Sequence, residues 1–323
     1  MIEGHGDDAY QYGNIRSDFS SNIMPNGNHQ LLMAHLATYP ELISHYPEPE
    51  AWSLERVIAR HHSLSPSQVI VTNGATEAIY LIAQAFRLQP EIPHPTFSEY
   101  EDACQMYPAE DTDHRVLWLC NPNNPTGDVY DQSVIDRMMV KYDLLVVDQS
   151  YECYTDQFVM NPRWAAQTPY MIQIHSLTKT YGVPGLRLGY ITAHESLTRH
   201  IRRFMRPWNV SALSVEAGKF LLAHEELRCE PDLNEAQRLR DHLEQLEGVI
   251  THETATNFML CRLERGAAAE LKDYLACEHG LLIRDASNFR GLTSQHFRVA
   301  AQSPKENDAL VSAIEKYLQQ CPI

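Results

Sequence analysis

Residues 176–190 read SLTKTYGVPGLRLGY, and this stretch carries the strongest signal for fold and function in the chain. An apolar run, Tyr170 to Ile174, precedes it and predicts a strand that ends shortly before the lysine. Two hydroxyl side chains stand before Lys179 in the string, and Arg187 follows eight residues after it. Hydroxyls and an arginine bind phosphate, and a lysine amine forms an imine with an aldehyde. The stretch therefore indicates a lysine that binds a phosphorylated aldehyde, pyridoxal phosphate.

Two other interpretations of the same residues stay open at this point. A lone lysine after a strand is commonly a solvated surface charge. Ser176 and Lys179 also form a Ser-x-x-Lys tetrad, which is the nucleophile motif of β-lactamase-like acyl enzymes. That class also carries Ser-Asp-Asn and Lys-Thr-Gly elements, and the chain contains neither. Other segments of the chain decide between these interpretations.

The composition is ordinary for a globular protein and strongly acidic. The 323 residues suffice for one large domain and a smaller one, and 44% of them are hydrophobic. A net charge of −16 disfavours non-specific binding to nucleic acid or to an anionic membrane. Local arginines can still bind an anionic substrate.

The chain lacks the sequence patterns of several protein classes. There is no run of about 18–20 apolar residues that would span a membrane, and Met1 to Asp8 lack a signal-peptide core. The seven cysteines form no Cys-x-x-Cys pair, and no Walker, Gly-x-Gly-x-x-Gly or His-Glu-x-x-His motif occurs. We therefore expect a cytoplasmic protein with reduced thiols, without a metal site and without nucleic-acid or membrane partners.

The hydrophobic pattern predicts two kinds of architecture in succession. Between about Gln68 and Ala193, apolar runs alternate with helical patterns, as in a doubly wound α/β sheet. After about Phe220, strands and helices follow in an order typical of a smaller α+β domain. We expect an N-terminal segment over 1–35 that packs near the active site and the small domain, a large α/β domain over 36–222 and a small domain over 223–323. The strands expected in the large domain are Val69–Thr72, Arg115–Cys120, Asp143–Val147, Tyr170–Ile174 and Leu188–Thr192.

Polar residues follow the carboxyl ends of these strands, where open α/β sheets bind ligands. Residues 73–76 begin a predicted helix and offer backbone N–H groups and a hydroxyl to an anion. Asp148 follows an apolar strand, where a buried carboxylate needs a cation such as a protonated pyridine nitrogen. Tyr151 and Asn124 could reach the phenolic oxygen of the same ring, and Phe97 could stack on it. A satisfied structural aspartate and ordinary core packing of the phenylalanine are the alternatives for single residues.

In combination these residues resemble the fold-type I pyridoxal phosphate enzymes, the aspartate aminotransferase superfamily of class I and II. The likeness extends from about Asp18 to Val299, with the motifs in the order of the family. It implies a large domain with a mostly parallel seven-stranded sheet and a smaller α+β C-terminal domain. It also implies that Lys179 forms the imine, that Asp148 pairs with the pyridine nitrogen and that Tyr151 acts beside them as a catalytic residue. The cofactor-binding residues implied by the resemblance are Gly74, Ala75, Thr76, Phe97, Asn124, Asp148, Tyr151, Ser176, Thr178, Lys179 and Arg187.

Two subfamilies are most similar, threonine-phosphate decarboxylase and histidinol-phosphate aminotransferase. The segments that look more like the decarboxylase are His5–Gly6, Asp18–Gly27, Met205–Val210, Arg284–Phe289 and Phe297–Ala300. The chain departs from that pattern at Asp7, where the decarboxylase usually has a second glycine, and it is short between Met106 and Arg115. The substrate-binding residues implied are His5, Asn22, Tyr46, Asn124, Arg284 and Arg298, with Tyr46 reaching across the interface of a homodimer with a shared active site.

Both chemistries use the same pocket. Arginines suit a phosphate or carboxylate through bidentate bonds, and the cofactor weakens whichever substrate bond stands perpendicular to its ring. We expect decarboxylation of L-threonine O-3-phosphate to (R)-1-aminopropan-2-yl phosphate, as in cobalamin biosynthesis. The alternative is a histidinol-phosphate-type aminotransferase that uses 2-oxoglutarate and glutamate. A non-catalytic protein that binds pyridoxal phosphate is a more remote alternative.

Overall fold

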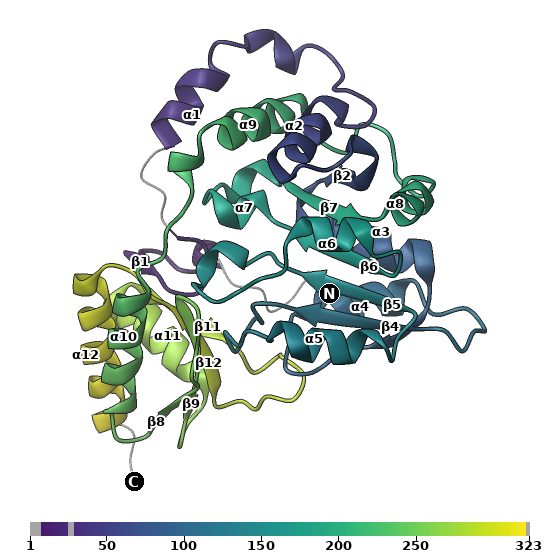
Figure 1. Cartoon of the computed structure of the whole chain (residues 1–323). Coiled ribbons are helices and arrows are strands. Elements are labelled where there is room, and N and C mark those ends of the chain that lie inside the picture. Colours follow the sequence, from purple (N-terminus) through teal and green to yellow (C-terminus); the bar gives the residue numbers. More distant parts are fainter. Residues whose placement is uncertain (1–7, 25–28, 321–323) are drawn as a thin grey trace.

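The computed structural model describes residues 8–24 and 29–320, and its helices and strands form two adjoining α/β parts (Figure 1). The larger part contains a six-stranded sheet in the order β2-β7-β6-β5-β4-β3. β3 to β6 run parallel, whereas β7 is antiparallel to both of its neighbours, β6 and β2. The strands are β2 (Val69–Thr72), β3 (Gln89–Glu91), β4 (Arg115–Cys120), β5 (Leu144–Asp148), β6 (Met171–His175) and β7 (Gly189–Ala193).

The sheet has one strand fewer than the seven that the resemblance implied. The helix α4 ends at Met106 and β4 begins at Arg115, so only residues 107–114 connect them. A further parallel strand with its crossover needs about a dozen residues or more. The shortness of this connection explains the difference, and the sheet otherwise has the mostly parallel α/β form that was expected.

Helices cover both faces of this sheet, which explains why its central strands are apolar throughout. Val146 and Ile174 point into a core beneath α3, α4 and α8, whereas Leu145 and Val147 point to the opposite face, towards α5 and α6. α2 and α9 complete this second face at the end of the sheet that β2 forms. The helices of this part are α1 (His29–Leu36), α2 (Trp52–His62), α3 (Gly74–Phe86), α4 (Glu99–Met106), α5 (Gln132–Met139), α6 (Pro162–Gln167), α7 (Leu177–Thr180), α8 (Glu195–Arg202) and α9 (Ala212–Ala223).

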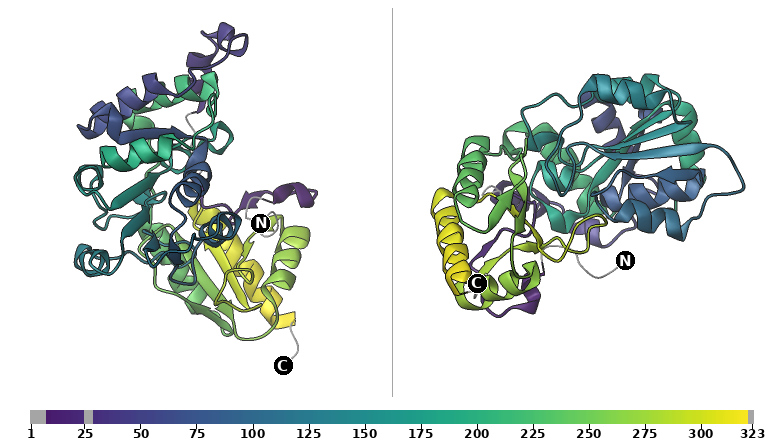
Figure 2. Two further views of the ribbon diagram at one scale, coloured as in Figure 1. Left: turned by 90° about the vertical axis from the view of Figure 1, so that its right-hand side faces the viewer. Right: turned by 90° about the horizontal axis from the view of Figure 1, so that it is seen from below.

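The smaller part is an antiparallel sheet in the order β11-β12-β9-β8, packed against three helices (Figure 2). Its strands are β8 (Val249–Thr251), β9 (Phe258–Leu263), β11 (Arg284–Asp285) and β12 (His296–Ala300). Its helices are α10 (Leu233–Glu244), α11 (Ala268–His279) and α12 (Pro304–Gln320). Within the described ranges, no helix combines the length and the apolar character that crossing a membrane requires.

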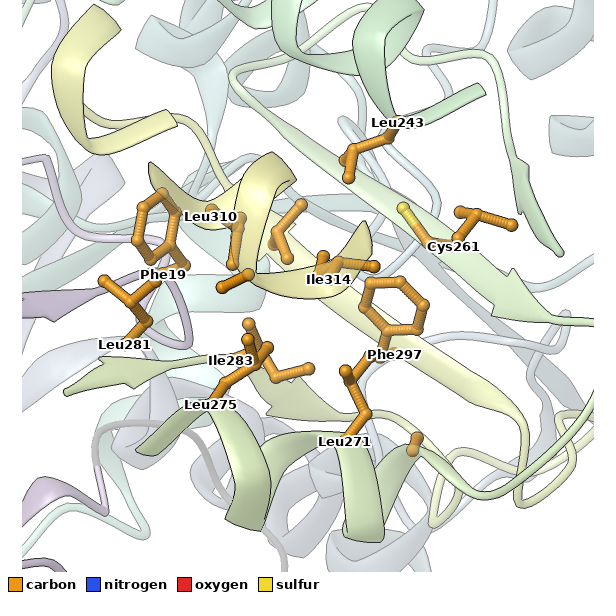
Figure 3. Close-up of a cluster of buried hydrophobic side chains, with 14 of the residues drawn as sticks. Phe19, Leu243, Cys261, Leu271, Leu275, Leu281, Ile283, Phe297, Leu310 and Ile314 are labelled. Atoms are coloured by element: carbon orange, nitrogen blue, oxygen red, sulfur yellow. The ribbon is translucent and has the colours of Figure 1, made fainter. Parts of the chain in front are cut away.

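The N-terminal segment is fastened to this smaller part. β1 (Ser17–Asp18) pairs with β10 (Leu281–Leu282) in parallel register. Phe19 follows, fully buried, and its ring packs beside Leu281 and Leu310 in the core of the smaller part (Figure 3). The backbone of Phe19 also accepts a bond from Ala300 and donates one to Leu282. The segment that leads to Asn22 therefore has a fixed position.

We predict that Phe19→Ala lowers the free energy of unfolding by about 3–5 kcal/mol, because it removes a buried ring from a packed core. Chemical unfolding followed by fluorescence measures this loss. Tyr10→Ala is the matched control, since Tyr10 lies in the same segment but is 84% exposed, and it should change stability by less than about 0.5 kcal/mol. Equal, small effects of both substitutions would contradict the anchoring role of Phe19.

Candidate active site

The carboxyl ends of β4, β5 and β6 open into a cavity of about 320 Å³ whose wall also includes residues of the smaller part. Most residues that were predicted from the sequence meet here. Those in the wall are Asn22, Ala75, Thr76, Phe97, Asn124, Asp148, Tyr151, Ser176, Thr178, Lys179, Arg187, Arg284 and Arg298. Gly74 lies directly before this wall at the start of α3. Tyr46 is not in the wall and is 84% exposed, and His5 lies outside the described residues.

Lys179 lies on α7, a single helical turn that follows β6 after Ser176. Its Nζ atom is 5.5 Å from the centroid of the Tyr151 ring, over the face of the ring. The hydroxyl of Tyr154 donates to the backbone carbonyl of Lys179 at 3.2 Å, and it accepts from the N–H of Met24. The lysine is therefore half-buried at the cavity, not a solvated surface charge, and its backbone is tied to the N-terminal segment.

Asp148 ends β5 with a side chain that is buried to 4% exposure. Its Oδ2 accepts from the Tyr100 hydroxyl at 2.8 Å, and its Oδ1 accepts from the backbone N–H of Ser150 at 2.8 Å. Burial raises the pKa of Asp148 above its ordinary value, and these hydrogen bonds oppose the rise. The nearby positive charge of His175 also opposes the rise, but Nδ1 of that histidine pairs with Glu152 at 3.2 Å. The site thus holds a carboxylate whose charge calls for a cationic ligand.

A concave turn at the start of α3 is suited to an anion, and we call it the anion cup. It is formed by residues 73–76, and Arg187 and Gly189 approach it closely. Gly74 has φ +80°, and a Cβ atom there would lie 2.7 Å from Nη2 of Arg187. A Cβ atom at Gly189 on β7 would lie 2.6 Å from the backbone nitrogen of Ala75. Gly189 is therefore required by the close approach of the backbone, and Gly74 by its left-handed φ. N–H groups at a helix start, with Ser176 and Thr178 nearby in the wall, are suited to a phosphate.

Two buried arginines reach the cavity from the smaller part, side by side on β11 and β12. Arg298 is 4% exposed, and among the residues that the structure describes it bonds only neutral acceptors, Asn124 Oδ1 and the backbone carbonyl of Ser20. Its Nε atom has no partner, and burial lowers its pKa to about 10. Burial also lowers the pKa of Arg284, which donates to Asn288 Oδ1 at 2.8 Å. Such a pair favours a ligand with anionic groups.

Asn22 adds a second unsatisfied group to the wall. It is 2% exposed and its side chain lies beside the Tyr151 phenol, yet neither its amide nitrogen nor its amide oxygen has a partner with good hydrogen-bond geometry among the described residues. A buried amide without partners is unfavourable by about 1–3 kcal/mol for each unpaired group. A bound polar ligand would satisfy it.

The sequence did not reveal every residue of the wall. Tyr100 was missed although it follows Phe97 by three residues, a spacing that brings side chains together at a helix start. Its ring meets Phe97 edge-on at 5.8 Å and stacks on Trp118 at 5.6 Å. Ser20 acts through its carbonyl oxygen, which any residue type would provide, so its contact with Arg298 has no sequence signal.

The wall as a whole fits pyridoxal phosphate. The anion cup suits its phosphate, the buried carboxylate suits its ring nitrogen, and the lysine suits its aldehyde. The unpartnered atoms of Asn22 and Arg298 leave polar capacity for a substrate beside it.

Comparisons with known proteins agree with this geometry. Residues 17–314 match the family model of aminotransferase class I and II. A putative threonine-phosphate decarboxylase of Caldanaerobacter subterraneus subsp. tengcongensis is 30% identical, covering 96% of this chain and 92% of that protein. A histidinol-phosphate aminotransferase of the same organism is also 30% identical, covering 84% of each chain. The crystal structure of L-threonine-O-3-phosphate decarboxylase from Porphyromonas gingivalis superposes with a TM-score of 0.89 and 38% identity, covering 94% of this chain and 99% of that one.

Family membership makes the protein an enzyme that depends on pyridoxal phosphate, and it excludes the serine acyl-enzyme interpretation of Ser176 and Lys179. The match covers the sheet, the cavity and the smaller part together. The resemblance seen in the sequence is thereby confirmed, and the chain belongs to the aminotransferase class I and II family.

Proposed function

We propose that the protein decarboxylates L-threonine O-3-phosphate to (R)-1-aminopropan-2-yl phosphate and CO2. The observation that carries this proposal is Arg298, a buried guanidinium that bonds only neutral acceptors and keeps an unpartnered Nε atom. Arg284 lies beside it on the neighbouring strand. A phosphorylated amino acid brings two anionic groups to these two cations, and its amine faces the lysine end of the cavity.

The cofactor would be held by residues of the wall in the roles that the family suggests. Asp148 would pair with the ring nitrogen, Tyr151 and Asn124 would bond the ring oxygen, and Phe97 would stack on the ring. The residues proposed for its phosphate are Gly74, Ala75, Thr76, Ser176, Thr178 and Arg187. When bound, pyridoxal phosphate supplies an electron sink for the bond broken at the substrate α-carbon.

The protein's own residues then have three tasks. The arginines hold the two anionic groups of the substrate, which fixes the bond that stands perpendicular to the ring. Lys179, held over the Tyr151 ring, is placed to deliver the proton that takes the position of the departed carboxylate. The N-terminal segment around Asn22 and the smaller part enclose the cavity and limit the access of water.

An aminotransferase acting on an amine phosphate remains the second candidate, because a histidinol-phosphate aminotransferase relative is as similar as the decarboxylase relative, at 30% identity. The decarboxylase is favoured by the wider coverage of its relative and by the 38% identity to the Porphyromonas enzyme. The two reactions differ in the bond that is held perpendicular to the ring. In the transaminase, Lys179 would remove the α-proton instead.

We further propose that two copies associate through an exposed apolar face at the large part, formed by Leu31, Met33, Ile43, Tyr46 and Trp208. α1 and the short helix η2 (Pro40–Ile43) carry much of this face and project from the body (Figure 1). The rings of Tyr46 and Trp208 contact each other at 5.3 Å. Exposed apolar patches of this kind commonly mark association surfaces. Tyr46 would then reach the cavity of the partner copy.

The expected reaction predicts release of CO2 from L-threonine O-3-phosphate by the holoenzyme without any keto-acid acceptor. The assay measures CO2 and the amino alcohol phosphate, with L-histidinol phosphate and 2-oxoglutarate in a parallel reaction. Lys179→Ala should abolish turnover, because the amine that delivers the proton is lost. Glutamate formation that depends strictly on 2-oxoglutarate, with no CO2 release, would reject the decarboxylase in favour of the transaminase.

Removal of the Tyr100 hydroxyl should raise the pKa of Asp148 further, because burial already raises it and the phenol is one of the donors that oppose the rise. Tyr100→Phe should therefore weaken cofactor binding roughly tenfold at acidic pH, where the carboxylate of the variant becomes neutral. The difference should shrink as the pH rises, since Asp148 is then ionised in both proteins. Equilibrium dialysis between about pH 5 and pH 9 measures it.

Tyr142→Phe is the control for this experiment, because Tyr142 also donates to a carboxylate, Glu91, but lies outside the cavity wall. It should bind the cofactor like the wild type at every pH. A Tyr100→Phe protein with a pH-independent loss of affinity would show that the hydroxyl acts only on local structure.

Shared active sites predict complementation between two defective proteins. Tyr46→Ala and Lys179→Ala should each have little activity alone, and refolding them together should restore part of it. A mixed dimer would contain one cavity that has both residues intact, one from each chain. Sedimentation velocity verifies the dimer, and mixtures that stay inactive would show that Tyr46 does not act across the interface.

A further inference from the structure

Glu77, one turn into α3, lies outside the cavity wall but contacts the turn that forms the anion cup. A single carboxylate oxygen, Oε2, accepts two hydrogen bonds. One comes from the backbone N–H of Asn73 at 2.5 Å, and the other comes from Nδ2 of Asn209 at 2.8 Å. None of the tasks proposed above uses either Glu77 or Asn209.

The bond to Asn73 fixes the entrance of the cup. Asn73 is the residue before Gly74, and its own side chain makes no capping bond to the helix. The hydroxyl of Thr72 donates to the carbonyl of Gly74 at 2.9 Å, and Gly189 packs against the backbone on the other side. Glu77 therefore acts like the glutamate of a capping box, which reaches back to the backbone N–H of the N-cap residue, and it holds the peptide that leads into the cup.

The bond to Asn209 connects this turn with a surface loop, residues 205–210. In that loop Trp208 has a left-handed backbone with φ +60°, and its N–H donates to the carbonyl of Pro49 at 2.8 Å. The Trp208 ring contacts Tyr46 on the exposed apolar face. A bulky residue at positive φ is strained, so bonds on both sides must hold it. Asn209 supplies the bond towards α3.

The charge of Glu77 is a poor explanation for its presence. A first-turn carboxylate is favourable to the helix dipole, but an anionic ligand in the cup uses the same N–H groups and is repelled by a neighbouring negative charge. The two accepted bonds need only an oxygen atom, which a glutamine also has. The contribution of Glu77 is therefore geometric.

We propose that Glu77 is a positioning residue. Together with Asn209, it connects the anion cup to the loop over residues 205–210 and thereby fixes the shape of the cup. This inference rests on the proposed binding of the cofactor phosphate in that cup. It assigns to Glu77 an effect on the phosphate end of the ligand alone, because neither of its bonds reaches the residues around Asp148 or Lys179.

The test compares equilibrium binding of pyridoxal phosphate with that of pyridoxal, which lacks the phosphate. Asn209→Ala removes one partly buried hydrogen bond and Glu77→Ala removes that bond and the one to Asn73, so each should weaken pyridoxal phosphate binding, by about tenfold or less for Asn209→Ala and by more for Glu77→Ala, and leave pyridoxal binding unchanged. Glu77→Gln should restore the affinity for pyridoxal phosphate, since it keeps the acceptor. Glu195→Ala, which removes another first-turn glutamate on α8, is the matched control and should change neither affinity.

Equal loss of affinity for both ligands in Glu77→Ala would overturn the inference, because it would indicate a general structural defect. Unchanged binding of pyridoxal phosphate in Glu77→Ala and in Asn209→Ala would overturn it as well. Failure of the proposed cofactor binding is distinguishable, since the wild type itself would then show no preference for the phosphorylated ligand and no borohydride-reducible adduct at Lys179; failure of the proposed decarboxylation would appear only as absent CO2 release, with both ligands bound as expected. Thermal unfolding of each variant identifies any that does not fold. If Glu77→Ala does not fold, the affinity of Asn209→Ala for the two ligands still tests the inference, because that substitution lies on a surface loop.

Discussion

The buried carboxylate of Asp148 is the constraint on which the rest of the site depends. It stands at the end of an apolar strand, and it accepts hydrogen bonds from neutral donors, the phenol of Tyr100 and Ser150. Such a group is tolerated in a protein core only if it becomes protonated or obtains a cation. The donors hold its oxygens in place, and Tyr100 is itself held between Trp118 and Phe97. The surroundings thus orient the acid towards a cationic ligand in the cavity, which we propose to be the ring of the cofactor.

A second constraint comes from the other side of the cavity, where the buried charge is positive instead of negative. Arg298 is a buried cation that meets only neutral acceptors, one on the large part, Asn124, and one in the N-terminal segment, Ser20. Its two contacts therefore join three separate stretches of chain around the ligand space. Phe19, packed into the core of the smaller part, holds Ser20 in position for this bond. An acid on one wall and an arginine pair on the other suit a ligand that is cationic at one end and anionic at the other.

Sequence patterns predicted the strand ends well, because apolar runs and the residues that follow them are local signals. Asp148, Asn124 and Lys179 were placed at one edge of a sheet for that reason, and the structure brings them to one cavity. The number of strands was overestimated, since the family's pattern was applied to a connection, residues 107–114, that is too short for another strand. Tyr46 shows a different limit. Its side chain is exposed in a single copy, and a role across an interface has no counterpart in local sequence.

Relatives named for decarboxylation and for transamination are equally similar to the chain, at 30% identity, and the proposed pocket accounts for this if the two reactions differ only in the torsion angle of the bound substrate. In the proposed site, the same lysine, acid and anion cup would serve both reactions. What differs is the position at which the arginines hold the anionic groups relative to the ring plane. Arg284 is oriented by Asn288 and by the carbonyl of Asp285, within the loop that follows β11. Under the proposed function, a change in that loop would turn the Arg284 guanidinium and shift the anionic group that it holds, so we expect the choice of reaction to depend on the smaller part.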